Sequence, residues 1–339
     1  MKKIFYIAIA ALAFASCNKE VNPSAGAEEV AVAVTVNMPG DISTKVIGDG
    51  LTATKLYYEV WSADKTTRFH RGTETLTERK TRLVLNLVRN QTYNILFWAQ
   101  DPNAAFYGVD DEDGLSTITM NYSPVGTAAG VVANDETRDA FYNNEIQNLL
   151  VNGPIERDVT LVRPFAQVNF GTTEADLDAA KVIGGMYPTQ SKVAFSVKLP
   201  TVLNLFTGEV SGEQDIVYDY TALPDPAKDG YLKVDLNKDG QFGADEQYLY
   251  LSMSYVLVSQ TESINADVTT NVKILSSVDK DAEGNDKVQS DVVVKVVSVP
   301  LKRNFRTNIL GDLLTAPSVF NIVIDQNFDP KDHNVFPNK

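Results

Sequence analysis

Cysteine, histidine and tryptophan are scarce in this chain, and each scarcity narrows the chemistry available to it. The 339 residues include one cysteine, two histidines and two tryptophans. A single cysteine excludes a disulfide within the chain, so packing must stabilise the fold. The histidines, His70 and His333, accompany no recognisable nucleophile motif, and we interpret both as surface residues.

Common catalytic and nucleotide-binding motifs are also missing. The sequence contains no G-x-S-x-G elbow, H-E-x-x-H pair, Walker loop or G-x-G-x-x-G turn, so we predict that the protein is not an enzyme. A glycosidase needs only two suitably spaced carboxylates, so 44 acidic residues leave that class open. No run of lysine or arginine offsets the formal charge of −14, which argues against nucleic acid as a partner.

The first residues match a lipoprotein signal. Two lysines precede an apolar stretch from Ile4 to about Phe14, which is too short to span a bilayer. Small residues then lead into Cys17, the position at which lipoproteins are cleaved and acylated. We predict that residues 1–16 are a signal peptide and that Cys17 carries a lipid. A buried N-terminal strand fits poorly, because lysines precede the stretch and a polar tail follows it.

Composition divides the rest of the chain. Residues 17–29 are small, polar and charged, and we interpret them as a tether. The valines of residues 30–36 alternate with other residues, which predicts a half-buried strand. Asn152-Gly153-Pro154 breaks the chain. We therefore expect an N-terminal domain over residues 30–153 and a C-terminal domain over residues 154–339.

Strand patterns rich in β-branched residues outnumber helical ones in both halves. Residues 134–150 are mixed and could be helical, and Thr173-Glu174-Ala175-Asp176 resembles a capping box before a short helix over residues 177–183. The other predicted strands are 55–61, 81–88, 92–99, 159–170, 192–199, 248–258, 271–276, 291–299 and 319–325. The predicted fold class is mostly β, with two antiparallel β-sandwich domains and a short helix in the second.

One segment matches a calcium motif in full. Asp235, Asn237, Asp239, Gly240 and Glu246 occupy positions 1, 3, 5, 6 and 12 of the EF-hand loop, where oxygen atoms surround calcium. The flanking sequences predict strands, whereas an EF-hand requires helices, so a hairpin turn is the competing interpretation. Calcium bound by Asp235, Asn237, Asp239 and Glu246 and a simple turn both remain open.

Aromatic side chains could form a glycan-binding platform. The candidates are Tyr57, Tyr58, Trp61, Trp98, Phe106 and Tyr107. Most of them fall in predicted strands, where large aromatic side chains usually pack in the core. We therefore favour core packing for this group.

The order of these segments resembles the fimbrillins, the type V pilins of Gram-negative gut and oral anaerobes. The resemblance rests on the lipoprotein signal, the early valine-rich strand, Thr-Lys-Val-Ile-Gly-Asp at residues 44–49 and Lys-Leu-Tyr-Tyr-Glu-Val-Trp at residues 55–61. Residues 161–170 and 299–309 resemble segments that recur in fimbrillin-like lipoproteins. The resemblance covers nearly the whole chain, through strand-forming patterns.

The resemblance implies two transthyretin-like domains in an outer-membrane, cell-surface protein that serves adhesion. In such pilins a protease cuts after a basic residue behind the first strand, and a strand of another subunit fills the groove. The matching bond here follows Lys45 and precedes Val46, where the family's major pilins carry arginine; the first arginine of the mature chain is Arg68. Either a lysine-tolerant protease acts, or the chain keeps its first strand as an anchor or accessory subunit.

The sequence itself is compatible with strand exchange. Loss of the valine-rich strand would expose unpaired backbone groups and an apolar groove. Phe320, Ile322 and Ile324 alternate in the same way near the C-terminus, as a donor strand or as an ordinary strand of the second domain. The alternative function is a surface glycan-binding lipoprotein of a nutrient-uptake system, which exposed, coplanar aromatic rings would favour.

Overall fold

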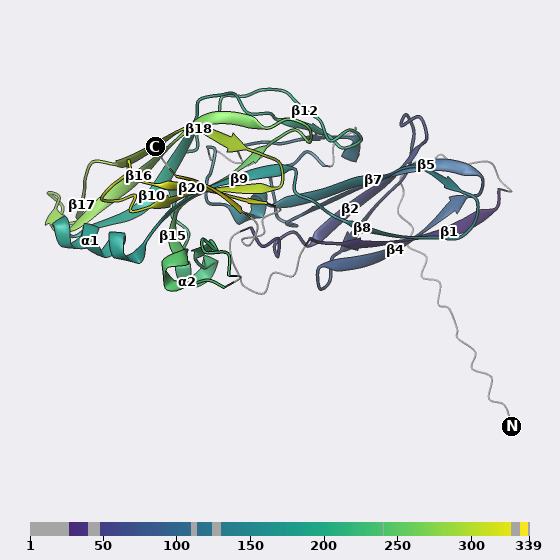
Figure 1. The fold of residues 1–339 in the computed structure, drawn as a ribbon. Coiled ribbons are helices and arrows are strands. Elements are labelled where there is room, and N and C mark those ends of the chain that lie inside the picture. Colours follow the sequence, from purple (N-terminus) through teal and green to yellow (C-terminus); the bar gives the residue numbers. More distant parts are fainter. Residues whose placement is uncertain are drawn as a thin grey trace.

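The computed structural model describes residues 27–39, 48–109, 114–123, 130–239, 241–326 and 333–337. These residues form two β-rich lobes that follow each other along the chain, with the N-terminal half in purple to teal and the C-terminal half in teal to yellow (Figure 1). Within these ranges no helix has the length and apolarity needed to cross a bilayer.

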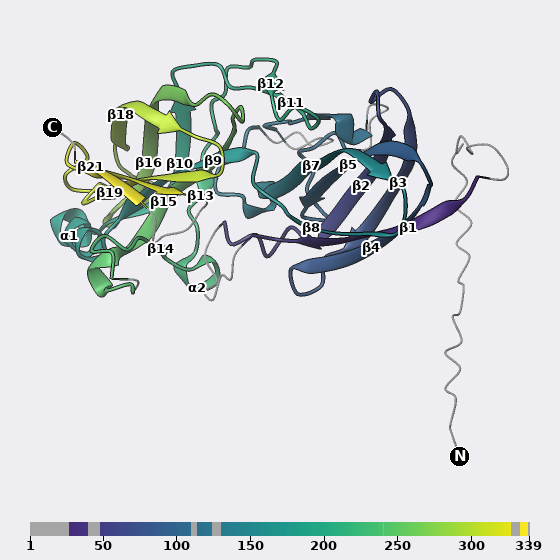
Figure 2. The same cartoon turned by 45° about the vertical axis from the view of Figure 1, so that its right-hand side comes forward.

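The N-terminal lobe is a sandwich of two sheets. Its strands are β1(Glu29–Asn37), β2(Lys55–Ser62), β3(Arg68–Thr75), β4(Lys80–Val88), β5(Gln91–Gln100), β7(Ala140–Val151) and β8(Ile155–Thr160). One sheet has the order β4-β1-β8 and the other the order β3-β2-β5-β7. Figure 2 shows β8, β1 and β4 side by side along one face of this lobe. The buried side chains between the two sheets form one apolar cluster.

The C-terminal lobe is a second sandwich. It contains β9(Phe165–Thr172), α1(Glu174–Gly184), β10(Met186–Phe195), β13(Thr221–Ala222), α2(Pro226–Asp229), β14(Leu232–Lys233), η3(Ala244–Glu246), β15(Gln247–Leu257), β16(Ile264–Lys280), β17(Asp286–Val288), β18(Val292–Leu301), β19(Phe305–Gly311), β20(Asn321–Gln326) and β21(His333–Pro337). One sheet follows the order β14-β15-β9-β19-β20-β21. The other follows β13-β10-β16-β17, with β18 also paired to β16. The mostly β fold class predicted from the sequence is confirmed.

Short elements join the two lobes. They are η1(Gly114–Ser116), β6(Thr117–Thr119), η2(Glu136–Arg138), β11(Val202–Asn204) and β12(Val210–Ser211). β6 from the first half pairs with β11 from the second. The buried guanidinium of Arg303 donates to the carbonyls of Val258 at 2.6 Å and Gly208 at 2.7 Å and to the hydroxyl of Tyr142 at 2.6 Å. Strand pairing and these hydrogen bonds therefore connect the two lobes.

Residues 134–150 form no α-helix, contrary to that expectation. Most of the segment is β7, whose first residues are buried on both faces. Ala140 and Tyr142 pack in the cluster shared with the C-terminal lobe, whereas Phe141 packs in the core of the N-terminal sandwich. Burial of both faces hides the polar–apolar alternation that usually reveals a strand.

The expected domain boundary at residues 152–154 falls in the turn between β7 and β8. β8 pairs in parallel with β1, so residues 155–160 belong to the N-terminal sandwich, and the chain passes to the second sandwich at residues 161–164. The predicted strand 159–170 is consequently split between β8 and β9.

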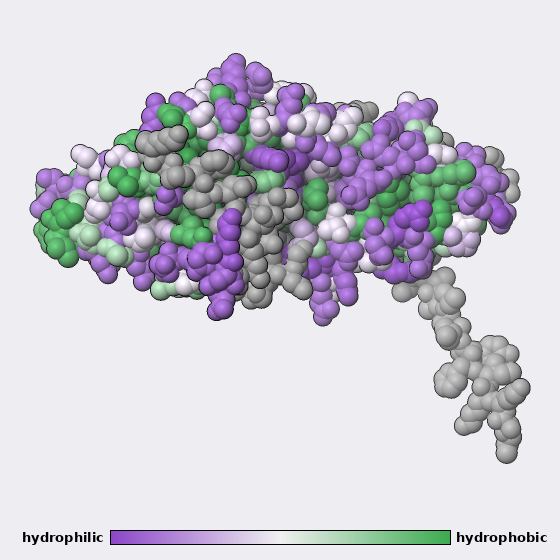
Figure 3. Space-filling model, in the orientation of Figure 1, coloured by the Kyte–Doolittle hydropathy of each residue, from purple (hydrophilic) through white to green (hydrophobic). Residues whose placement is uncertain are grey.

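The predicted short helix is present as α1. Thr173 is its N-cap, and the Thr173 hydroxyl accepts the Asp176 N–H at 3.1 Å. The helix ends where Gly185 adopts a left-handed conformation, which a residue without a Cβ adopts at little cost. Near this end, Val182, Ile183 and Val278 are exposed. Figure 3 shows an apolar area here and another over the N-terminal sandwich, on an otherwise mostly hydrophilic face.

Candidate functional site at the first strand

β1 is the central strand of its sheet. It pairs antiparallel with β4 over nine residue pairs and parallel with β8 over six. Val32, Val34 and Val36 are completely buried in the core of the N-terminal sandwich. The predicted valine-rich strand is therefore confirmed. Its removal would leave facing edges of β4 and β8 unpaired on either side of an apolar groove.

Two arginines, one at each end of β4, hold the two ends of β1. Arg89, after β4, donates to both carboxylate oxygens of Glu28 at 2.8 and 3.1 Å, and its N–H donates to the Glu28 carbonyl at 2.8 Å. Arg79, before β4, donates through Nη2 to the Pro39 carbonyl at 2.6 Å. We call these contacts the Arg89 latch and the Arg79 latch.

The Arg79 latch also reaches the far side of the segment that follows β1. Nη1 of Arg79 donates to the Asp49 carbonyl at 3.0 Å. Lys45 and Val46, the predicted processing position, lie between these anchors but outside the described residues, as does Cys17. The described chain on either side of residues 40–47 is thus held by one guanidinium.

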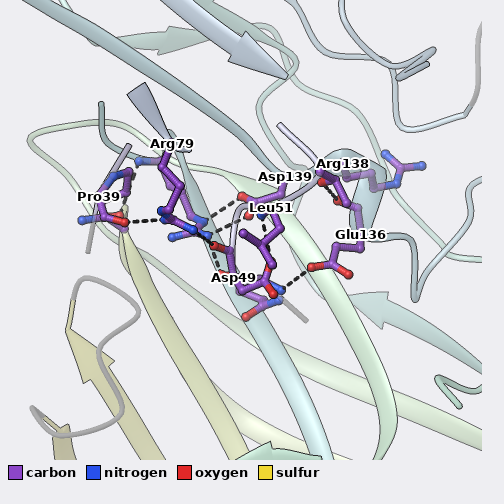
Figure 4. Close-up of polar contacts among 12 residues, drawn as sticks. Pro39, Asp49, Leu51, Arg79, Glu136, Arg138 and Asp139 are labelled. Carbon is purple, nitrogen blue, oxygen red and sulfur yellow. Dashed lines mark hydrogen bonds and ion pairs between the residues drawn. The ribbon is translucent and has the colours of Figure 1, made fainter. Parts of the chain in front are cut away.

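A polar cluster secures the same region (Figure 4). Arg163 donates through Nε and Nη2 to the two carboxylate oxygens of Asp139, at 2.7 Å each, and Nη2 also donates to the Gly48 carbonyl. Oε1 of Glu136 accepts the Gly48 N–H at 3.1 Å. Gly48 is consequently fixed by both its backbone N–H and its carbonyl. Figure 4 shows the Arg138 side chain pointing away from these groups.

Two acidic side chains of this cluster, Glu136 and Asp139, have raised pKa values. Burial raises the pKa of Glu136 to about 7, with repulsion from Asp49 and Asp139 acting in the same direction and the Gly48 hydrogen bond opposing both. Burial also raises the pKa of Asp139, although Arg163 favours its ionised form. Glu136 therefore changes charge near neutral pH at a point of contact with the chain that leads away from β1.

The C-terminal candidate donor is integrated in a sheet. β20 pairs with β19 on one side and with β21 on the other. Phe320 is buried, but Ile322 and Ile324 are only partly buried, and Val323 and Asp325 on the alternate face are completely buried. Both faces of β20 are therefore at least partly buried, and not only the face that carries Phe320, Ile322 and Ile324. In this chain β20 is an ordinary interior strand.

The calcium motif forms a loop between β14 and β15 in which its side chains accept the loop's own N–H groups. Glu246 accepts from Asn237 and Gly243 at 3.0 Å each, and Asp235 accepts from Asp239 at 3.1 Å. Asn237 also accepts from Asp239, at 2.9 Å. No group of three or more histidine, cysteine or acidic side chains in the described part of the chain is placed to hold a metal. Calcium binding stays a prediction.

The aromatic platform candidates are all buried, so the expectation of core packing is confirmed. They are Tyr57, Tyr58, Trp61, Trp98, Phe106 and Tyr107. His70 is partly buried, and its Nε2 lies 3.3 Å from the Tyr58 hydroxyl oxygen. The side chain of His333 lies outside the described residues.

Comparison with curated proteins finds no match. Among solved structures, the chain is similar to a fimbrial assembly protein from Parabacteroides distasonis, with 13% identity, a TM-score of 0.43 and coverage of 91% of this chain and 99% of that one. It is also similar to a proposed cell adhesion protein from the same species, with 12% identity, a TM-score of 0.45 and coverage of 91% and 96%.

A third similar structure is the tip fimbrial protein Mfa3 from Porphyromonas gingivalis, with 10% identity, a TM-score of 0.39 and coverage of 83% of this chain and 94% of that one. At this degree of similarity none of the three assigns a function to this chain. A family model described as a family of unknown function, DUF6562, matches residues 23–336. The chain therefore belongs to the DUF6562 family.

Proposed function

We propose that this protein is a cell-surface subunit or anchor of a type V, fimbrillin-like pilus with a role in adhesion. In this proposal Cys17 carries the lipid that holds the mature chain at the outer membrane. The partners are other pilin subunits or further copies of the same chain, joined by strand exchange at the groove that β1 occupies.

The placement of β1 is the observation that carries the proposal. β1 lies between β4 and β8, so its loss would free nine residue positions on β4 and six on β8. The chain continues from β1 through residues 40–47, which include Lys45. Cleavage at one peptide bond would therefore separate a central strand from the rest of its own sandwich.

The groove would favour a replacement strand. Three fully buried valines contribute about 5 kcal/mol or more, at roughly 1.5–3 kcal/mol for each such side chain. Main-chain pairing along both edges adds to the affinity and selects for an alternating apolar sequence. A strand held in this way should dissociate slowly.

The C-terminal segment is the candidate donor. β21 pairs with β20 as the last described strand of its sheet, and no other described strand pairs with its second edge. Donation would require residues 319–339 to leave this position. If no protease acts at Lys45, β1 stays in place, and the protein serves as an anchor or accessory subunit.

Truncation tests strand exchange directly. A chain starting at Val46 should form oligomers that persist as a ladder in unheated SDS gels, whereas the mature chain starting at residue 17 should stay monomeric. Deleting residues 319–339 from the truncated chain should abolish the ladder if this segment is the donor. A well-folded, monomeric truncated chain at high concentration would contradict assembly by strand exchange.

Lipid attachment is tested separately. Cys17→Ala should abolish metabolic palmitate labelling and move the protein out of the membrane fraction, because a lipid chain supplies the membrane affinity. Cys17→Ser is the matched control for side-chain size and should behave in the same way. Membrane association unchanged in both variants would sink the lipoprotein prediction.

A further inference from the structure

A cavity of about 420 Å³ opens where β1 begins, at the end of the N-terminal sandwich. Its walls come from the residues just before β1, from β3 and from the hairpin that joins β4 to β5. The side chains used in the argument are Glu28, Phe69, Arg89, Asn90, Gln91 and Tyr93. The volume falls within the range of about 300–1,000 Å³ that is typical of small-molecule sites.

Two aromatic rings give this cavity a firm apolar floor. Phe69 and Tyr93 meet edge to face, with ring centroids 5.7 Å apart. Tyr93 is buried, and its hydroxyl oxygen accepts the Val88 N–H at 3.1 Å, which fixes the ring. Phe69 is only partly buried, so part of its ring remains available for contact with a ligand.

The charges that line the cavity neutralise each other. Arg89 and Glu28 form the ion pair of the Arg89 latch, with Nη1 bonded to both carboxylate oxygens. Nε of Arg89 donates to the Asn152 carbonyl at 3.0 Å. A cavity whose two charges are already paired offers little to an anion or a cation, and it therefore favours an uncharged ligand.

Two amide side chains on the rim are available for hydrogen bonds. Asn90 and Gln91 are exposed, and their side-chain amides bond to no other described residue. Each amide offers one acceptor and two donors. Asn90 has φ 61°, a left-handed turn conformation that asparagine tolerates well. Two neighbouring amides beside an aromatic face match a ligand with an apolar ring face and several hydroxyls.

We propose that this cavity binds a neutral saccharide, with one sugar ring against Phe69 and its hydroxyls bonded to Asn90 and Gln91. This site goes beyond the assembly function and uses Glu28, which immediately precedes the first strand. The latch and the Tyr93 hydrogen bond hold the walls before any ligand arrives, which lowers the ordering cost of binding. The sugar could come from a free glycan or from a membrane glycolipid.

Calorimetry and saturation-transfer NMR on the full mature chain would test this site. The probes are glucose, galactose, mannose, N-acetylglucosamine, lactose and cellobiose, together with phosphatidylcholine vesicles containing lactosylceramide. We expect millimolar or tighter binding of at least one probe. Binding to the vesicles that exceeds binding to phosphatidylcholine vesicles without lactosylceramide, with no binding of the free sugars, would assign the sugar to a glycolipid. Binding to the free sugars would assign it to a soluble glycan.

Three substitutions connect binding to the cavity. Gln91→Ala and Asn90→Gly remove one amide each, and glycine preserves the left-handed turn. Phe69→Leu removes the ring but keeps apolar volume. Each of the three substitutions should weaken binding at least tenfold, and Gln91→Ala and Asn90→Gly should leave the melting temperature unchanged. Gln241 is an exposed amide of the C-terminal lobe, so Gln241→Ala should leave binding unchanged.

Several outcomes would overturn the proposal. They are no binding of any probe at 20 mM sugar or to the vesicles, or binding that none of the three cavity substitutions weakens. Sialyllactose, titrated in the same way as a negatively charged comparison, should bind no more strongly than lactose. Stronger binding of sialyllactose would also overturn the proposal, because a cavity with paired charges would not prefer an anionic sugar. Oligomer formation by the truncated chain is a separate measurement, so this site and the assembly proposal can fail independently.

Discussion

Arg163 and Asp139 form a buried, two-bond ion pair that connects the chain between the lobes to the start of β7. Both bonds measure 2.7 Å, and the two side chains are at most 2% exposed. Because Arg163 also donates to the Gly48 carbonyl, the pair contributes to the anchoring of the chain beyond β1. This contact could not be predicted from the sequence, because Gly48 lies 115 residues from Arg163.

Breaking this pair should destabilise the fold strongly. Arg163→Ala leaves the Asp139 carboxylate buried without its cation, which typically costs about 3–5 kcal/mol. Thermal and urea unfolding of both proteins would measure the loss. Arg163→Lys keeps the charge but not the planar guanidinium, so its stability should lie between those of the parent and Arg163→Ala. An Arg163→Ala protein as stable as the parent would contradict this account.

Glu136 should make stability depend on pH in a defined direction. Its pKa is about 7 in the folded protein, above the ordinary value of 4.5, so the folded state binds the proton more tightly than the unfolded state. This contribution is fully present below about pH 4.5 and is lost as the pH rises to about 7. The total is on the order of 3 kcal/mol, from 1.36 kcal/mol per pKa unit.

Glu136→Gln isolates that contribution, because glutamine keeps an acceptor for Gly48 without the charge. The variant should be more stable than the parent above pH 7, and the difference between the two stabilities should shrink toward pH 4.5. Urea unfolding from pH 4.5 to 8 would show this. A difference that stays constant across this range would rule out titration of Glu136 as the cause.

The calcium motif leads to a prediction that separates its two interpretations. Asp235 and Glu246 accept backbone N–H groups of their loop, so Asp235→Ala should destabilise the chain by about 1–3 kcal/mol in chelator, with or without a metal role. If calcium binds, the parent should also release or absorb calcium-dependent heat that Asp235→Ala lacks. Absence of that heat in the parent leaves the turn interpretation alone.

Local patterns predicted much of the fold. The alternating valines of β1 and the capping residues before α1 act over a few neighbouring positions, so their meaning is legible in sequence. β7 was not predicted as a strand because both faces of its first residues are buried. The parallel pairing of β8 with β1 depends on strands that are more than 100 residues apart. Sequence alone specifies no such register.

The candidate site was predicted only in part. The strand and the calcium loop carry recognisable spacing, but the two latches do not. Arg79 meets Pro39 and Arg89 meets Glu28 only because β4 lies beside β1, and neither arginine belongs to a motif. The cavity proposed to bind sugar likewise combines residues that precede β1 with residues of β3 and the β4–β5 hairpin, which sheet topology brings together.

The two latches should contribute unequally to retention of β1 after cleavage. On the β1 side of the cleavage position, Arg79 donates one charge-assisted hydrogen bond, to the Pro39 carbonyl, and such a bond contributes roughly 1.5–3 kcal/mol. Its bond to the Asp49 carbonyl lies on the other side of Lys45 and does not hold the cleaved strand. The Arg89–Glu28 ion pair is solvent-exposed, where such pairs contribute about 0–1 kcal/mol. Arg89 also keeps its backbone bond to Glu28 when its side chain changes.

Matched glutamine variants test this difference. After digestion with a lysine-specific protease, Arg79→Gln should release the β1 peptide at least tenfold faster than the parent, whereas Arg89→Gln should change the rate less than fivefold. Gel filtration separates the released β1 peptide from the remaining protein, and mass spectrometry of these two fractions measures the extent of release over time. Because neither substitution creates or removes a lysine, the cleavage sites are the same in all three proteins. Equal release from the two variants would show that Arg79 does not act as the dominant latch. Release from both at the parent's rate would show that the paired edges of β4 and β8 alone retain the strand.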